Sequence, residues 1–223
     1  MIAVDLATAR IGGYVPPENK EVTMSKVAVI YYSSTGTNKQ LADAVAEGAR
    51  AAGSEVRVRL VPETAPAAAV DSNPAWRKFI DDMKGETPAA LDDLAWADAV
   101  IMGTPTRFGN VSSQLKSFID SAGGLWFQGK LQDKVYAGFT SAMNAHGGQE
   151  ATLLSLYTTF YHFGGFVVPP GYTDSSVFAA GGNPYGPSVT TGQDNNGPTP
   201  QDLAHAAYLG KRVAETAAKL RGN

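Results

Sequence analysis

The stretch Val27-Ala28-Val29-Ile30-Tyr31-Tyr32-Ser33-Ser34-Thr35-Gly36-Thr37-Asn38 decides the fold that the rest of the chain completes. Its first half is a continuous apolar run, which is typical of a β-strand buried on both faces. Downstream, small and apolar residues recur with the spacing of one face of an α-helix at Leu41, Val45, Gly48 and Ala52. A loop of small and hydroxylated residues therefore joins a buried strand to the N-terminus of a helix.

The loop 33–38 has the composition of an anion site. Backbone N–H groups, side-chain hydroxyls and the positive end of the helix dipole can all be directed at one anion there. The loop contains no Lys or Arg, and it has neither the Walker A spacing nor the Rossmann glycine spacing. We interpret it as a site for a terminal phosphate monoester. The alternative is an ordinary helix start, where Ser and Thr are favoured anyway.

Strand and helix patterns alternate along the rest of the chain. Strands are predicted at 26–32, 55–60, 99–103, 135–141 and 165–168. Helices are predicted at 38–52, around 76–83, 91–96 and 111–119, at 149–163, and from Thr199-Pro200 onward. Such alternation predicts an α/β fold with a parallel sheet covered by helices on both faces. The strand 55–60 alternates polar and apolar residues, which indicates an edge, so the five strands match the flavodoxin-like doubly wound order 2-1-3-4-5.

In a sheet of this order, ligands bind beyond the carboxyl ends of the strands, at the switch point between strands 1 and 3. The loops after the first, third and fourth strands meet there, and they are the loops richest in polar residues and glycine. The second of them contains Pro105, Thr106, Arg107, Phe108 and Gly109. Its backbone N–H groups can bond the polar edge of a flat heterocycle, and Arg107 would favour negative charge on a reduced flavin. The alternative is a surface turn with a solvated arginine.

The third loop offers groups for the other side of such a ring or for its ribityl chain. It consists of Ser141, Ala142, Met143, Asn144, Ala145, His146 and Gly147.

Two features lie outside the three loops. His162 falls near the end of a predicted helix, where histidine commonly partners the helix terminus. Trp126 and Phe127 follow a glycine pair, and they form either loop packing or an aromatic wall or subunit contact over a flat ligand.

Composition excludes several functional classes. The 223 residues are 43% hydrophobic and carry a net charge of −3, which argues against nucleic acid as the main partner. The absence of cysteine excludes disulfides, thiol catalysis and thiolate metal sites, and no His/carboxylate group has metal spacing. No apolar run approaches the roughly 18 residues of a membrane helix, so we expect no membrane insertion and a cytoplasmic protein.

Two regions have little periodicity. We expect residues 1–23 to be a flexible N-terminal extension or an expression remnant, with an oligomer arm as the alternative, and residues 24–223 to form one domain. Residues 169–199 are dense in Gly, Asn, Pro, Ser and Thr, and loops of that length are usually functional or disordered.

With these motifs in hand, the chain resembles the WrbA-type flavoproteins, the type IV NAD(P)H:quinone oxidoreductases. The resemblance covers Lys26 to Leu220. Its most specific stretches are Gly103–Asn110, Gly123–Trp126, Gly147–Glu150 and Pro184–Gly186.

The resemblance implies bound FMN, NAD(P)H as electron donor, a quinone substrate and a homotetramer. It assigns the phosphate to residues 33–38, the flavin ring to residues 106–108 and 141–147, and a flavin contact to His162. Trp126 matches a position that faces the quinone site from a neighbouring subunit. Thr35 falls where the family usually has a nicotinamide-site Tyr, and the third loop is one residue longer than in the family and poorer in Ser, Thr and Gly.

The resulting hypothesis is a two-electron quinone reductase in which NAD(P)H and the quinone use one face of FMN in turn, with ping-pong hydride transfer. Two alternatives belong to other classes. One is a flavodoxin-type one-electron carrier, although flavodoxins are usually shorter and far more acidic. The other is a non-enzymatic assembly protein that uses the flavodoxin fold as an interaction surface.

Overall fold

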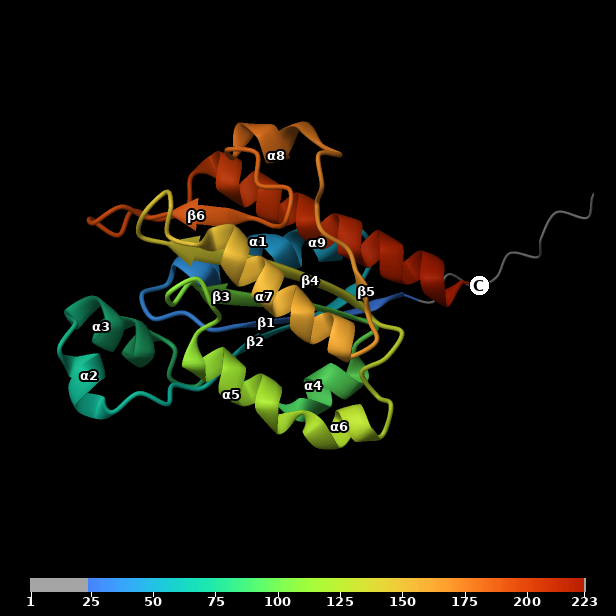
Figure 1. Ribbon diagram of the computed structural model, residues 1–223, viewed down its shortest axis with the longest axis horizontal. Helices are drawn as coiled ribbons and strands as arrows, with labels where there is room; N and C mark the ends of the chain where they lie inside the picture. Colours follow the sequence, from blue (N-terminus) through green and yellow to red (C-terminus); the bar gives the residue numbers. More distant parts are fainter. Residues whose placement is uncertain (1–23, 223) are drawn as a thin grey trace, which may run out of the picture.

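The computed structural model describes residues 24–222, so the expectation for residues 1–23 lies outside the described residues. The strands are β1 Lys26–Tyr31, β2 Glu55–Leu60, β3 Ala99–Pro105, β4 Val135–Ala142, β5 Phe166–Val167 and β6 Ser188–Thr190. The longer helices are α1 Thr37–Ala51, α3 Pro74–Asp82, α5 Ser113–Ser121, α7 Gln149–His162 and α9 Pro200–Arg221. The shorter helices are α2 Ala67–Asp71, α4 Leu91–Trp96, α6 Gly123–Phe127 and α8 Ser175–Ala179. Figure 1 shows the sheet running through the centre of the molecule.

The sheet is parallel and has the order β2-β1-β3-β4-β5, which confirms the predicted flavodoxin-like topology. Strand β1 pairs on one side with β2, in the register Lys26↔Glu55, and on the other with β3, in the register Val27↔Ala99. All strands point the same way, so the loops that follow β1, β3 and β4 leave the sheet at one edge.

The fifth strand position is divided between two short strands. β5 pairs with β4 at Val135 and Tyr136, whereas β6 pairs with β4 from Thr140 to Ala142. Since β3 occupies the other side of β4 over this whole length, β5 and β6 lie on the same side of it. The predicted single strand 165–168 was therefore too long. Residues 169–199, predicted as a long loop, contain the short elements α8 and β6. Elements of three to five residues are too short to show a period.

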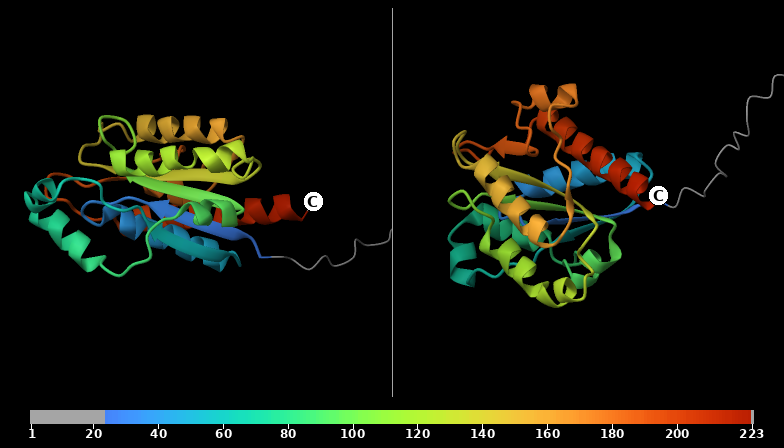
Figure 2. Two further views of the ribbon diagram at one scale, coloured as in Figure 1. Left: turned by 90° about the horizontal axis from the view of Figure 1, so that it is seen from below. Right: turned by 45° about the vertical axis from the view of Figure 1, so that its right-hand side comes forward.

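Helices cover both faces of the sheet (Figure 2). One apolar core lies between the sheet and helices α1 and α9, and the other lies beneath α4, α5 and α7. The backbones of α1 and α9 almost touch: a Cβ added to Gly48 would lie 1.8 Å from the Ala207 carbonyl oxygen, and one added to Gly210 would lie 1.9 Å from that of Val45. Only glycine permits this approach. No helix within residues 24–222 combines the length and apolar character needed to cross a membrane.

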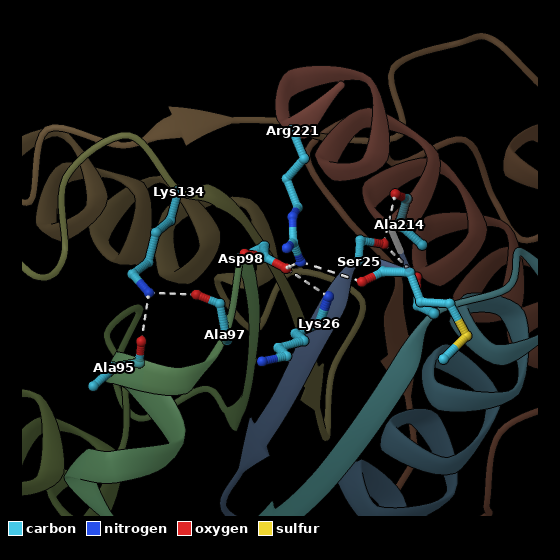
Figure 3. A network of polar contacts seen from close by, with 10 residues as sticks. Ser25, Lys26, Ala95, Ala97, Asp98, Lys134, Ala214 and Arg221 are labelled. Atoms are coloured by element: carbon cyan, nitrogen blue, oxygen red, sulfur yellow. Dashed lines mark hydrogen bonds and ion pairs between the residues drawn. The ribbon is translucent and has the colours of Figure 1, made fainter. Parts of the chain in front are cut away.

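Polar contacts close the amino edge of the sheet (Figure 3). The Asp98 carboxylate accepts hydrogen bonds from the Lys26 backbone N–H at 2.7 Å and from the Arg221 guanidinium at 2.5 Å. Beside it, the Lys134 ammonium donates to the carbonyl oxygens of Ala95 and Ala97. These contacts join the starts of β1, β3 and β4 to the end of α9, at the edge opposite the loops described above.

A buried histidine sits inside the α9 layer. His205 is 1% exposed, and its Nε2 has no hydrogen-bond partner within residues 24–222. Burial lowers the pKa of the imidazole to about 4, because the charged form is poorly solvated there, and the nearby Asp202 and Asp174 oppose the shift only partly. The folded protein thus holds this side chain neutral.

This burial predicts a loss of stability in mild acid. Between pH 6.5 and pH 4 the unfolded chain binds a proton at His205 and the folded chain does not, so the free energy of unfolding falls as the pH drops. We expect urea unfolding of the wild type to lose about 2 kcal/mol more between pH 7 and pH 5 than the His205→Gln variant. The exposed His146→Gln variant serves as the control and should follow the wild type. Parallel curves for wild type and His205→Gln would contradict the assignment.

Candidate cofactor-binding site

The loops after β1, β3 and β4 line one pocket of about 550 Å³ at the carboxyl edge of the sheet. The predicted site residues that line it are Ser33, Ser34, Thr35, Thr37, Asn38, Pro105, Thr106, Arg107, Ser141, Ala142, Met143, Asn144 and Gly147. The geometry thus brings together side chains that are more than one hundred residues apart. The predicted site residues that do not line the pocket are Gly36, Phe108, Gly109, Ala145, His146, Trp126 and His162.

The first loop leaves the N-terminus of α1 without a side-chain cap. Gly36 is the N-cap residue, with a φ of 98°, a left-handed conformation that favours glycine. Its own N–H donates to the Ser33 hydroxyl at 3.0 Å, which folds the loop over the helix end. Asn38 is 1% exposed, and its Oδ1 has no hydrogen-bond partner in the part of the chain that the structure describes. An uncapped helix terminus beside an unpaired buried amide suits an external anion that carries hydroxyl groups.

The second loop is a tight turn whose backbone bonds are mostly used internally. The N–H of Thr106 donates to the Ser141 carbonyl, and Arg107 and Asn110 exchange backbone hydrogen bonds at 2.8 and 3.0 Å. The predicted edge of free N–H groups at 106–109 is therefore reduced to Phe108 and Gly109. Phe108 has a φ of 54° and a fully exposed ring.

Arg107 bridges the first two loops. Its guanidinium donates to the Thr106 carbonyl at 3.0 Å and lies 3.5 Å from the Ser34 hydroxyl. Sequence reasoning expected this charge beside a heterocyclic ring. In the structure the Arg107 side chain also faces the first loop, residues 33–38, which is called the hydroxyl loop below. It can therefore attract an anion bound at the start of α1.

Hydrogen bonds join the second and third loops. The Thr106 hydroxyl accepts from Thr152 at 2.7 Å and donates to the Gly147 carbonyl at 3.3 Å. A Cβ on Gly148 would lie 2.9 Å from the Gly109 Cα, so the two loops touch through their backbones. Their relative position is thus fixed without a ligand.

Two further walls were missed by sequence reasoning. The N-terminus of α3 contributes Asn73 and Ala75, and the segment after β6 contributes 191–193 and Asn195. The second wall is held by a hydrogen bond from the Thr35 hydroxyl to Asn195 Oδ1 at 3.1 Å and by backbone bonds to the third loop. No sequence signal marked it, because residues 191–195 reach the pocket only through the pairing of β6 with the end of β4.

Trp126 and His162 lie at a different place on the chain surface. Together with residues of α5 and α7 they line a hollow of about 310 Å³ that shares no residue with the pocket. The indole Nε1 donates to the His162 carbonyl at 2.9 Å, and Trp126 is 54% exposed. Within one chain, therefore, neither residue reaches the pocket formed by the three loops. Residues 123–127, predicted as a loop, form the short helix α6.

Comparison with known proteins agrees with this geometry. Residues 25–178 match the family described as NADPH-dependent FMN reductase. The chain belongs to this family. It is 48% identical over 198 residues to the NAD(P)H dehydrogenase (quinone) of Deinococcus radiodurans, covering 88% of this chain and 98% of that protein. It is 46% identical over 204 residues to the protein of the same name from Cupriavidus metallidurans, covering 89% of this chain and 100% of the relative.

Among solved structures, the WrbA-like flavodoxin of Agrobacterium tumefaciens is similar, with a TM-score of 0.62 and 29% identity over 87% of this chain and 98% of that one. The FMN reductase family membership and this neighbour confirm the resemblance and the fold that the sequence predicted. The family match ends at residue 178, so β6 and the wall after it lie beyond the matched segment.

The two positive-φ glycines at the ends of α1 allow a matched test of the first loop. Gly36 and Gly53 have φ values of 98° and 84°, and an added Cβ would meet only the Phe79 ring at 3.6 Å or nothing within 4 Å. Alanine at either position should cost about 1–2 kcal/mol of stability, since both require a left-handed backbone. We expect Gly36→Ala to weaken FMN binding about fivefold to tenfold, because the strained loop relaxes away from its binding shape.

Gly53→Ala should bind FMN as the wild type does, since Gly53 lies at the other end of the helix. Titration of flavin fluorescence measures both dissociation constants. Equal FMN affinities for the two variants would place the cofactor elsewhere.

Proposed function

We propose that this protein is an FMN-dependent NAD(P)H:quinone oxidoreductase that reduces quinones to hydroquinones by two electrons. The observation that carries the proposal is the uncapped N-terminus of α1, which opens beside the unpaired Asn38 amide into a pocket walled by the β3 and β4 loops. FMN suits these groups, because its phosphate and ribityl hydroxyls match a helix terminus and a buried amide oxygen. When bound, FMN supplies the redox chemistry between NAD(P)H and the quinone. The names of the relatives support the same activity.

The residues of the pocket have separate roles in this proposal. Residues 33–38 hold the phosphate through hydroxyls and backbone N–H groups of the α1 terminus. Arg107 is the one basic side chain among the described residues that line the pocket. It attracts the phosphate across Ser34 and favours the extra negative charge of the reduced cofactor. The turn at Phe108 and Gly109 and the third loop frame the ring, and Thr35 stands at the nicotinamide side.

We further propose a homotetramer in the cytoplasm, in which the active site is completed by a neighbouring subunit. Trp126 and His162 lie outside the pocket of their own chain, and Phe108 exposes its ring completely. Large exposed aromatic side chains are typical of interfaces. In the tetramer, Trp126 of one chain would face the pocket of another and restrict the space above the flavin to flat molecules.

Reconstitution tests the activity. Added FMN should bind stoichiometrically, NADH should bleach its visible absorbance without oxygen, and benzoquinone should restore it. Because both substrates would use the same space in turn, initial rates at several quinone concentrations should give parallel double-reciprocal lines. Absence of FMN binding would exclude the proposal. Intersecting lines would exclude the shared space, and quinone reduction no faster than by free FMN would favour the electron-carrier alternative.

Replacement of Trp126 tests the composite site. Trp126→Ala should lower kcat/KM for benzoquinone about tenfold, with little change in FMN affinity, since the indole would contact substrate and not phosphate. Phe127→Ala removes a neighbouring exposed ring and is the control, expected to retain quinone activity. Sedimentation equilibrium of all three proteins should give the mass of four chains. A monomeric wild type with full activity would contradict the composite site.

A further inference from the structure

One carboxylate accepts an unusual number of hydrogen bonds next to the pocket. Glu63 follows β2, in the connection that leads to α2 and α3. Its Oε1 accepts from the Gln114 amide at 2.6 Å and from the backbone N–H groups of Thr64 and Ala65 at 2.9 and 2.7 Å. Its Oε2 accepts from the Tyr32 hydroxyl at 2.7 Å and from the Trp76 indole at 2.9 Å. Glu63 itself does not line the pocket.

The three side-chain donors come from three different segments of the chain, and none of the donors lines the pocket itself. Tyr32 directly precedes Ser33, the first residue of the hydroxyl loop. Trp76 directly follows Ala75, which lines the pocket from α3. Gln114 lies in the first turn of α5, the helix that leaves the Arg107 turn. Figure 1 shows α3 and its partner α2 projecting beside the carboxyl edge of the sheet, away from both helical layers. Glu63 is therefore the point at which this projecting segment is tied to β1 and α5.

The partners require an ionised carboxylate. Partial burial alone would raise the pKa of Glu63, but the hydrogen bonds from Ala65, Tyr32, Gln114 and Trp76 outweigh it and hold the pKa below its usual value. Conversely, burial and the bond to Glu63 raise the pKa of the Tyr32 hydroxyl, so it remains a donor. Every group that faces the carboxylate donates, and a carboxylate is the side chain that only accepts.

We propose that Glu63 is a positioning residue for the cofactor pocket, which holds the hydroxyl loop, the α3 wall and the start of α5 at fixed separations through one carboxylate. The proposal rests on the proposed function, because it takes FMN as the occupant of this pocket. The side chain never touches the occupant. It acts because Tyr32 and Trp76 are each next in the chain to a residue that lines the pocket, and Gln114 lies at the start of the helix that follows the Arg107 turn.

The argument predicts a specific effect of the isosteric amide. In Glu63→Gln an NH₂ group replaces one acceptor oxygen and faces a donor, so at least one of the three segments is released. We expect the FMN dissociation constant to rise tenfold or more. Tyr32→Phe and Trp76→Phe each remove one donor and should raise it about threefold. The pair Glu63→Gln and Trp76→Phe should be non-additive, because both changes break the same contact.

The matched control is Asp93→Asn. Asp93 is also a buried carboxylate, which accepts hydrogen bonds from the Ala90 N–H and from Arg57, but it lies in α4 beside β2 and does not line the pocket. Loss of its charge should destabilise the apoprotein at least as much as Glu63→Gln does. It should leave the FMN dissociation constant within twofold of wild type, measured by flavin fluorescence at a temperature where far-ultraviolet circular dichroism shows every variant folded.

The outcomes separate the two proposals. Wild type that fails to bind FMN overturns the proposed function and the role of Glu63 together. Wild type that binds FMN, with Glu63→Gln within twofold of it or with Asp93→Asn weakened equally, overturns only the positioning role. If Glu63→Gln does not fold, the single-donor variants decide: an unchanged dissociation constant in both overturns the proposal, and a threefold rise in both supports it.

Discussion

The site depends on one constraint, the parallel pairing of β1 with both β2 and β3. Parallel strands place all their carboxyl ends at one edge, and the switch between the two crossover directions at β1 and β3 leaves space there that no connecting helix covers. Helix α1 starts at this space with its N–H groups directed at it and no side-chain cap. The topology thus places the positive end of the α1 dipole at this space, and glycine at the N-cap position, Gly36, leaves that helix end without a side-chain cap.

The two edges of the sheet use polar groups in opposite ways. At the amino edge, Asp98 joins the start of β1 to the end of α9, and Lys134 donates to the Ala97 carbonyl just before β3. At the carboxyl edge, the start of α1 has no side-chain cap, and the Asn38 amide oxygen has no hydrogen-bond partner among the described residues. Unsatisfied buried polar groups are rare in folded proteins, and each requires an explanation such as a functional role. This difference between the two edges agrees with an amino edge that is rigid and a carboxyl edge that is preorganised for a ligand.

Two insertions in the flavodoxin-like plan give the pocket its outer walls. The segment between β2 and β3 delivers α3, and Glu63 ties it to Tyr32 and Gln114. The segment between β5 and β6 divides the fifth strand and returns the chain to the carboxyl edge, where Asn195 meets Thr35. In both cases hydrogen bonds between segments far apart in the chain help to hold the wall in place.

The sequence by itself determined the sheet order, the three converging loops and most of the pocket residues. The continuous apolar run 27–32 indicates a strand buried on both faces, and the alternating run 55–60 indicates a strand buried on one face. The sequence also carried the motifs of the family. Only the tertiary structure decided the walls at Asn73 and Asn195, the role of Glu63, and the separation of Trp126 and His162 from the pocket. These depend on contacts between segments far apart in the chain, made by elements too short to leave a period. A local sequence pattern indicates which side of an element faces the core. Hydrogen bonds between segments far apart in the chain form only when the complete tertiary structure brings those segments together.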